Sequence, residues 1–435
     1  MSNTKLGLAG LQNVGNTCYM NSVLQLLLNS SAFVSFLNNN KGNGSSKYEE
    51  YLTKASINRV AKNERKRLRL SEDDTVNIRK SDIDKVAEKS ITKQLSNIIS
   101  TIISKGNTII QPIDFKNRCD KLLPAFQGHR QHDAHEFLIQ LLDLIIEETG
   151  IQTKPVLSNI PESVKVYFKI KKKIMELEDG DPNKDELINK FISYCNKNKD
   201  VVLKVEGINY YINLYKNNYN PLIYTLHTIF NTSFRCSNCN NITNKYETAT
   251  ILSLELGEDL YESFNKFTNA EVIPEFNCSN CNSNNPNEKT CHLWRLPITL
   301  FIHLKRFKYS PNGRYIKDNS PIIIPKILNL SDYCDKLNVF NDALNPIYEL
   351  GGISHHYGSI NGGHYAAECT SLVSGHWYNF NDSCVSKCEQ PIYTEGTFAK
   401  GTFAKGTFGG GGGGDGDSYQ SQSAYILRYD LCLNP

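Results

Sequence analysis

Apolar residues recur at helical spacing in two well-separated segments of this 435-residue chain. The first segment follows a polar, turn-prone run at 13–17, so Cys18 falls in the first turn of a predicted helix. Its apolar positions are Met20, Val23, Leu24, Leu27 and Leu28. The second segment predicts a helix on which Asp133 and Glu136 share an outward polar face. Its buried stripe is Phe137, Leu138, Leu141, Leu142 and Ile145.

The pattern changes to alternation in three other segments. Residues 365–368 alternate as a strand entered from a glycine turn at Gly362 and Gly363. The segment WYNFND at 377–382 predicts a second strand that pairs with the first as a hairpin, and TILSLEL at 250–256 alternates in the same way. Helical segments followed by groups of strands are typical of an α+β fold.

Cys18 has the setting of a nucleophile. Unpaired backbone N–H groups and the positive end of the helix dipole stabilise a thiolate at the start of a helix. A thiolate at neutral pH is a strong nucleophile. The alternative interpretation of Cys18 is a small buried cysteine at a helix start.

His364 lies between a flexible glycine pair and Tyr365. Asn381 and Asp382 end the second strand of the predicted hairpin and can hold the imidazole ring. Together with Cys18 these residues supply a nucleophile, a base and an orienting group, as acyl transfer by cysteine requires. The alternative interpretation of His364 is a hydrogen-bonded structural histidine.

Four cysteines form two CxxC pairs, each followed by Asn or Ser residues suited to a tight turn. They are Cys236, Cys239, Cys278 and Cys281. This spacing predicts a four-thiolate zinc site, and the site is structural because four protein sulfurs leave no open position for water. The strand predicted between the pairs allows the two turns to sit at the tips of paired strands. Two disulfides are the alternative, which a reducing compartment disfavours.

Five blocks of the chain resemble one known family, the ubiquitin-specific proteases, which are papain-like cysteine peptidases. GLAGLQNVGNTCYMNSVLQ resembles the cysteine box of the family, and GGISHHYGSINGGHYAAE with HWYNFNDSCV resembles its histidine box. RQHDAHEFLIQLLD is similar to the block between the two boxes. LPITLFIHLKRF and AYILRY are similar to palm strands of the family. The five blocks also occur in the order of the family.

The resemblance implies a papain-like fold with a helical thumb, an antiparallel β palm and zinc-ribbon-like β fingers. It implies Cys18 as nucleophile, His364 as base, Asn13 as the side chain that stabilises the oxyanion, and Asn381 as the group that orients His364. Asp382 is the rival for the last role. The implied reaction is hydrolysis after the C-terminal glycine of ubiquitin through a thioester.

The resemblance also implies contacts with the arginine-containing tail of ubiquitin. Asp133 and Glu136 would receive the arginines, and the terminal glycines would pass Gly362 and Gly363. Gln131 and Tyr365 complete the expected substrate contacts. From the residues alone, an ordinary solvated face is the favoured interpretation of the two carboxylates. The fingers, with structural Zn²⁺, would grip the body of ubiquitin.

Composition adds limits on compartment and partners. A net charge of +3 is too small to indicate nucleic acid, and we expect no membrane span and a monomer. Thirteen cysteines and a polar start without a signal peptide favour an intracellular enzyme of the cytoplasm, with the nucleus as an additional location left open. The basic run KNERKRLRL at 62–70 fits a nuclear-import signal, although a solvated helix is the favoured interpretation.

The expected domains follow the same blocks. We expect residues 1–150 to form the thumb, with a polar insertion at 38–90. Residues 151–222 are expected to form an insertion or small subdomain whose role the sequence does not indicate. Residues 223–292 form the fingers and 293–435 the palm, with a flexible glycine-rich linker at 395–418.

Two rival functions stay open at this point. An inactive ubiquitin-binding scaffold would keep the zinc cysteines but lose Cys18, His364 or Asn381, all of which are present. A protease for another ubiquitin-like modifier would share the chemistry but not the tail, and the acidic pair favours a tail with arginines.

Overall fold

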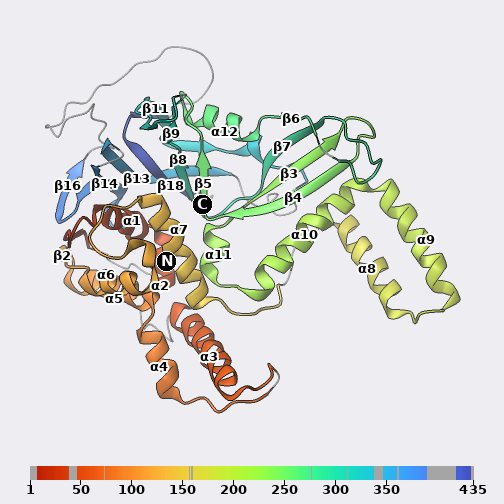
Figure 1. Ribbon diagram of the computed structural model, residues 1–435, viewed down its shortest axis with the longest axis horizontal. Helices are drawn as coiled ribbons and strands as arrows, with labels where there is room; N and C mark the ends of the chain where they lie inside the picture. The colour runs from red at the N-terminus through yellow and green to blue at the C-terminus, as the bar shows by residue number, and fades with distance from the viewer. Residues whose placement is uncertain are drawn as a thin grey trace.

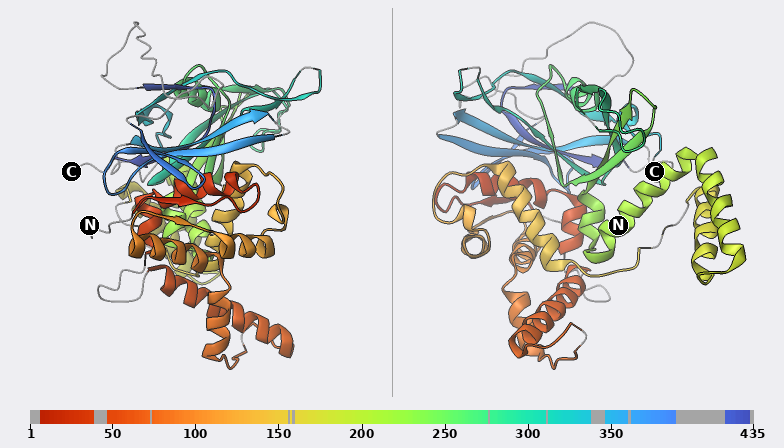
Figure 2. Two further views of the ribbon diagram at one scale, coloured as in Figure 1. Left: turned by 90° about the vertical axis from the view of Figure 1, so that its left-hand side faces the viewer. Right: turned by 45° about the vertical axis from the view of Figure 1, so that its right-hand side comes forward.

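The computed structural model describes residues 7–38, 47–72, 74–155, 157, 160–275, 277–310, 312–337, 346–359, 362–388 and 418–432. A helical lobe lies below a large β-sheet, and a second sheet extends to one side of it (Figure 1). Two helical projections leave this body, one from the helical lobe and one beside the second sheet (Figures 1 and 2). The arrangement is the expected thumb, palm and fingers.

The palm is an eight-stranded sheet that carries both the histidine and the asparagine of the predicted site. Its order is β16 (Cys384–Cys388), β15 (Trp377–Asn381), β14 (Gly362–Thr370), β13 (Ile347–Ser359), β18 (Ala424–Leu431), β8 (Thr299–Leu304) and β5 (Ile251–Leu254), with β12 (Ile327–Asn329) also on β13. The predicted hairpin of β14 and β15 is confirmed. All pairs are antiparallel except β5 with β8. The expected antiparallel palm is therefore present, and the parallel strand at its edge comes from the range 223–292 that was predicted for the fingers.

The thumb packs its central helix against the palm. Its elements are β1 (Ala9–Leu11), α1 (Cys18–Leu28), α2 (Ser31–Leu37), α5 (Ile91–Lys105), β2 (Thr108–Ile110), α6 (Ile113–Leu122), the 3₁₀ turn η1 (Pro124–Phe126) and α7 (Ala134–Thr149). Every residue of α1 is buried, because α7 covers one side of it and β14 covers another. The helix therefore lies between thumb and palm, with Cys18 as its first residue.

The polar insertion at 38–90 contains a helical hairpin. Helix α3 (Lys47–Leu68) and helix α4 (Lys80–Glu88) project from the thumb (Figure 2). The last turn of α3 carries Arg65, Lys66 and Arg67. Most of the basic run is solvent-exposed, which confirms the favoured interpretation of a solvated helix.

The second insertion is also helical and packs on the fingers. It contains α8 (Glu162–Glu176), α9 (Pro182–Lys197), α10 (Lys199–Asn217) and α11 (Pro221–Leu226). Its apolar core contains Val164, Val205 and Ile208 together with Trp294 of the neighbouring sheet. The insertion therefore shares a hydrophobic core with the fingers and, among its described residues, does not form a separate hydrophobic core.

The fingers are a four-stranded sheet in the order β4 (Ile242–Ala249), β3 (Thr228–Cys236), β7 (Asn287–Arg295) and β6 (Glu271–Ile273). The predicted strand in TILSLEL is present as β5, but it belongs to the palm and not to this sheet. Helix α12 (Leu260–Thr268) follows β5 and packs against β5, β7 and the short strand β11 (Ile322–Pro325).

Smaller elements complete the palm side. They are the hairpin of β9 (Phe307–Tyr309) and β10 (Tyr315–Lys317), the pair of β11 (Ile322–Pro325) and β17 (Ser418–Ser421), and η2 (Ser331–Tyr333). The expected linker at 395–418 lies outside the described residues apart from Ser418. Within the described part, no single helix has the length and apolarity to cross a membrane, and the sharply bent pair α1 and α2 meets those two criteria only when taken together.

Candidate active site

Cys18 begins α1, as predicted, and its side chain is buried. The loop before it is folded around the side chain of Asn13, whose Oδ1 accepts hydrogen bonds from the backbone N–H groups of Gly15 (3.1 Å) and Thr17 (3.0 Å). Gly15 and Asn16 both have positive φ, at 117° and 52°, a region that glycine and asparagine enter at low cost. The loop geometry therefore depends on the residue types that precede Cys18.

His364 lies near the start of β14 and meets both expected partners. Its Nε2 lies 2.7 Å from Oδ1 of Asn381 on β15, and its side chain is hydrogen-bonded with Cys18. The hydrogen bond with Cys18 raises the pKa of His364 to about 9, burial opposes the shift, and the bond with Asn381 adds to it. This arrangement favours an imidazolium beside the sulfur.

Asp382 contacts the nucleophile side of the cleft instead of His364. Its Oδ2 accepts a hydrogen bond from Nδ2 of Asn13 (3.1 Å) and its Oδ1 accepts one from Nδ2 of Asn21 (2.8 Å). Its backbone oxygen accepts from the N–H of Leu11 (2.8 Å). The adjacent residues Asn381 and Asp382 therefore contact different partners, and the role of each in turnover stays a prediction.

Asn21 is a site residue that the sequence interpretation missed. It lies three positions after Cys18 on a fully buried helix, and only 2% of it is exposed. Its Nδ2 bonds both Asp382 and the backbone oxygen of Leu11. A carboxamide among apolar positions of a predicted core helix is the signal that could have found it, since a buried polar group needs partners.

The predicted acidic pair does not point outward as a pair. Asp133 caps α7, because its Oδ1 accepts from the N–H groups of His135 (2.7 Å) and Glu136 (3.1 Å). Its Oδ2 accepts from the Tyr425 hydroxyl of β18 (2.5 Å). The prediction that the two residues share an outward face is therefore wrong for Asp133, because hydrogen bonds within the protein engage both of its carboxylate oxygens. Glu136 is exposed.

Gln131 and Gly363 contact each other across the two lobes. Gln131 Nε2 donates to the Gly363 oxygen and the Gly363 N–H donates to Gln131 Oε1, both at 3.0 Å. A Cβ at Gly363 would lie 2.3 Å from the His356 ring, whereas a Cβ at Gly362 would meet no atom within 4 Å. Of these two glycines, Gly363 is therefore the one that packing requires.

Tyr365 is buried, with 6% of it exposed, and belongs to an aromatic group at the wall of the cleft. Its ring lies 4.7 Å from that of His356 and 6.1 Å from that of Tyr425, centroid to centroid. Phe307 packs on the same two rings. The sequence interpretation expected Tyr365 as a substrate contact, and the structure places it among core rings.

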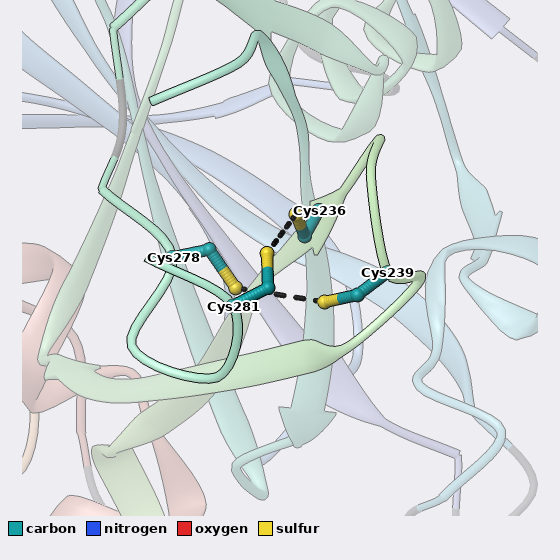
Figure 3. Close-up of side chains that lie close together, drawn as sticks. All are labelled: Cys236, Cys239, Cys278 and Cys281. Atoms are coloured by element: carbon teal, nitrogen blue, oxygen red, sulfur yellow. Dashed lines mark hydrogen bonds between the residues drawn. The ribbon is translucent and has the colours of Figure 1, made fainter. Parts of the chain in front are cut away.

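The four predicted zinc cysteines come together at the tip of the fingers (Figure 3). Two turns supply them, one after β3 and one before β7. Asn240 and Asn282 follow the second cysteine of each pair and have φ of 55° and 52°. Each donates its N–H to the first cysteine's oxygen, so the two turns have matching geometry.

The donor set fits a tetrahedral zinc ion. All four Sγ atoms lie within 4.8 Å of one another, with Cys236 and Cys281 at 3.8 Å and Cys239 and Cys278 at 3.7 Å. Four sulfurs about 2.3 Å from one zinc are about 3.8 Å apart in a tetrahedron. The hydrogen bond between Cys281 and Ser283, with one that Asn238 donates to the Cys281 sulfur, lowers the pKa of Cys281 to about 6. Cys281 therefore favours the thiolate, the form that binds metal.

Fold and site together define a cysteine peptidase with a cleft between two lobes. The family model described as "Ubiquitin carboxyl-terminal hydrolase" matches residues 9–429. The chain therefore belongs to the ubiquitin carboxyl-terminal hydrolase family, whose members are cysteine-type deubiquitinating enzymes.

Relatives and solved structures agree with this assignment. The chain is 25% identical over 414 residues to a probable ubiquitin carboxyl-terminal hydrolase R319 of Acanthamoeba polyphaga mimivirus, covering 88% of this chain and 86% of the relative. It is 25% identical over 402 residues to ubiquitin carboxyl-terminal hydrolase 2 of Bos taurus, covering 88% of this chain but only about half (53%) of that relative. The SAGA Ubp8/Sgf11/Sus1/Sgf73 DUB module bound to ubiquitin aldehyde has a similar fold, with a TM-score of 0.56, 20% identity, and coverage of all of this chain and 72% of that one.

Proposed function

We propose that this chain hydrolyses isopeptide and peptide bonds at the C-terminal glycine of ubiquitin, with Cys18 as nucleophile and His364 as base. The observation that carries the proposal is the contact of His364 with both Cys18 and Asn381, which come from opposite ends of the chain. Such a group of three is what thioester chemistry needs.

The proposed reaction has two halves. The sulfur of Cys18 attacks the glycine carbonyl, and His364 gives its proton to the leaving lysine amine as the thioester forms. His364 then takes a proton from water, which attacks the thioester and releases ubiquitin and the free thiol. Asn381 accepts a hydrogen bond from Nε2 of His364, which leaves the other ring nitrogen for the sulfur.

Asn13 supports the negative charge that develops on the carbonyl oxygen. Its Nδ2 carries two hydrogens, and Asp382 accepts one of them. The second hydrogen and the N–H of Cys18 are the proposed donors to the oxyanion. One preorganised donor of this kind is worth about 3 kcal/mol in the transition state.

The proposed substrate path runs from the fingers to the cleft. A hollow of about 430 Å³ lies between the fingers, α12 and β5, and it is lined by Phe230, Phe234 and Phe267 among lysines and glutamates. We place the body of ubiquitin against it and the tail along Glu136. Zinc, held by the four cysteines, would tie the finger tips together and take no part in the chemistry.

None of the thirteen cysteines, all of which the structure describes, is paired in a disulfide, and we propose a reducing, intracellular compartment for this chain. A monomer that binds ubiquitin and its conjugates remains part of the proposal.

The test is an intact-mass measurement with ubiquitin that carries a C-terminal electrophile. We expect one adduct on the wild-type chain and none on Cys18→Ala. The matched control is Cys384→Ala, because Cys384 is exposed and directly follows the Asn381–Ser383 turn; it should retain the adduct. An adduct that persists in Cys18→Ala excludes Cys18 as the nucleophile, and reaction only with a different ubiquitin-like modifier excludes ubiquitin.

A further inference from the structure

A short segment, residues 127–133, connects η1 to α7 and touches both catalytic segments. We call it the strap. His129 of the strap accepts a hydrogen bond from Nδ2 of Asn16 through its backbone oxygen (2.8 Å), and Asn16 lies two residues before Cys18. Gln131 pairs with Gly363, which directly precedes His364. The strap therefore bridges the nucleophile loop and the strand of the base.

The start of the strap is fixed to the thumb. Gly128, with φ of 87°, accepts a hydrogen bond from Nζ of Lys116 (2.7 Å) and donates its N–H to Oδ1 of Asp120 (3.3 Å). Lys116 is a buried cation, with 4% of it exposed, and it also forms an ion pair with Asp120. A buried charge is tolerated only with partners, so this anchor resists displacement.

The strap also packs closely against the nucleophile loop. A Cβ at Gly15 would lie 2.4 Å from the His129 ring, and Gly15 has φ of 117°. The absence of a side chain at Gly15 thus lets the strap approach the loop that leads into Cys18. At its other end the strap finishes at Asp133, which accepts from Tyr425 of the palm.

Gln131 bonds the backbone N–H and oxygen of Gly363 on the side of β14 where β15 does not extend. Strand β15 pairs with β14 only over Ala367–Thr370, so Gly363 lies beyond the end of that pairing. On the other side Gly363 is opposite Gly358 of β13. The side-chain amide of Gln131 supplies one donor and one acceptor to the same residue, as a paired strand does.

We propose that Gln131 is a positioning residue, through which the strap holds the His364 strand at the correct distance from Cys18. This proposal deepens the proposed function and rests on its assignment of Cys18 and His364. It also replaces the expected role of Gln131 as a contact to the ubiquitin tail. Misplacement of a catalytic pair by about 1 Å reduces turnover by roughly 100-fold.

The test compares Gln131→Ala with Gln127→Ala in the full chain. Gln127 is exposed and lies in the same strap, so it is the matched control and should behave as wild type. With ubiquitin bearing a C-terminal fluorophore, Gln131→Ala should lower kcat by roughly 10- to 100-fold. KM, and the Kd for ubiquitin measured in a Cys18→Ala background, should change by less than about threefold because binding contacts remain.

A second readout separates positioning from general loss of stability. The rate at which iodoacetamide alkylates Cys18, followed on the Cys18 peptide by mass spectrometry, should fall near neutral pH in Gln131→Ala, and its pH profile should shift. Gln131→Glu should recover part of the rate, since a carboxylate still accepts from the Gly363 N–H but cannot donate to its oxygen. A variant that only loosens the fold would lower Tm without moving the pH profile.

An independent variant tests the other end of the strap. Asn16→Gly keeps the positive φ but removes the bond to His129, so it should lower kcat in the same manner. A rise in KM and Kd with unchanged kcat in Gln131→Ala would overturn the proposal and make Gln131 a substrate contact. If wild type fails to cleave ubiquitin while Gln131→Ala still alters Cys18 alkylation, the proposed function fails and the positioning role stands.

Discussion

The zinc turns and the catalytic cleft are both assembled from two separate chain segments, but they are joined by different means. Each zinc turn closes on itself through its own backbone, with Asn240 and Asn282 in the same left-handed conformation. Beyond the end of the β3–β7 pairing, the two turns contact each other through the sulfurs of the four cysteines and the side chains beside them. Four thiolates repel one another, so this junction needs a cation.

The cleft, in contrast, is joined by hydrogen bonds that form without a metal. Asp382 of the palm accepts from Asn13 and Asn21 of the thumb, and Gln131 pairs with Gly363. Removal of metal should therefore affect substrate capture more than the reactivity of Cys18. The following predictions test this difference.

The largest effect is expected from Asn381→Ala and Asp382→Ala, which remove different parts of the cleft. Asn381→Ala removes the acceptor of His364 and should lower kcat by roughly 100-fold. Asp382→Ala frees Asn13 and Asn21 from the palm and should lower kcat through the oxyanion donor, by roughly 10-fold. Steady-state kinetics with fluorogenic ubiquitin measures both.

The order of the two effects decides the assignment. If Asp382→Ala lowers kcat further than Asn381→Ala does, Asp382 is the more important of the two residues for turnover, and our assignment of Asn381 as the residue that orients His364 is wrong. Asn379→Ala is the control, because its side chain is on the same strand and bonds Glu368 rather than His364. It should retain most of the activity.

Repeated local patterns were easier to predict than contacts between lobes. The helix that starts at Cys18, the hairpin of His364 and the four cysteines each have a signal within a few residues. The strand in TILSLEL was also predicted, but its sheet was not, because alternation does not specify a partner. Pairing is decided by tertiary packing.

The orientation of Asp133 could not be predicted for a similar reason. Helical spacing put it on one face with Glu136, but it lies one residue before α7 and caps the helix. An aspartate just before an apolar stripe fits both a helix N-cap and an outward helical face, and spacing alone does not distinguish them. Its hydrogen bond with Tyr425 joins residues that are 292 positions apart, and no local pattern indicates such a contact.

A smaller effect is expected when zinc is removed. Cys281→Ser, or treatment with a strong chelator, should release zinc, lower Tm and raise KM for ubiquitin by roughly tenfold, since metal binding contributes folding free energy to the fingers. Alkylation of Cys18 should stay unchanged. Metal content by mass spectrometry, Tm and KM are the measurements.

The matched control is Cys291→Ser, because Cys291 lies on β7 of the same sheet but outside the cluster. It should keep its zinc. Loss of Cys18 reactivity together with zinc would contradict the comparison, because it would mean that the cleft depends on the fingers.

A change of pH near neutrality is expected to have the smallest effect. The cleft should lose activity at high pH, whereas the zinc turns should lose metal at low pH. The pKa of His364 is raised from 6.5 to about 9, chiefly by its hydrogen bond with Cys18. The imidazolium therefore persists through neutral pH. Its contribution to stability is fully present below pH 6.5 and is lost as the pH rises through about 9. The zinc turns should fail on the acid side instead, because protons compete with metal for thiolates.

We therefore expect kcat/KM to be nearly flat through neutral pH and to fall above about pH 9. The Asn381→Ala variant should move this alkaline limb to lower pH, because the hydrogen bond with Asn381 also raises the pKa of His364. Cys281→Ser should leave the limb in place, since Cys18, Asn381 and Asp382, the residues that raise the pKa of His364, all lie outside the fingers. An alkaline limb that stays fixed in Asn381→Ala, or one that moves in Cys281→Ser, would remove the distinction between the two regions.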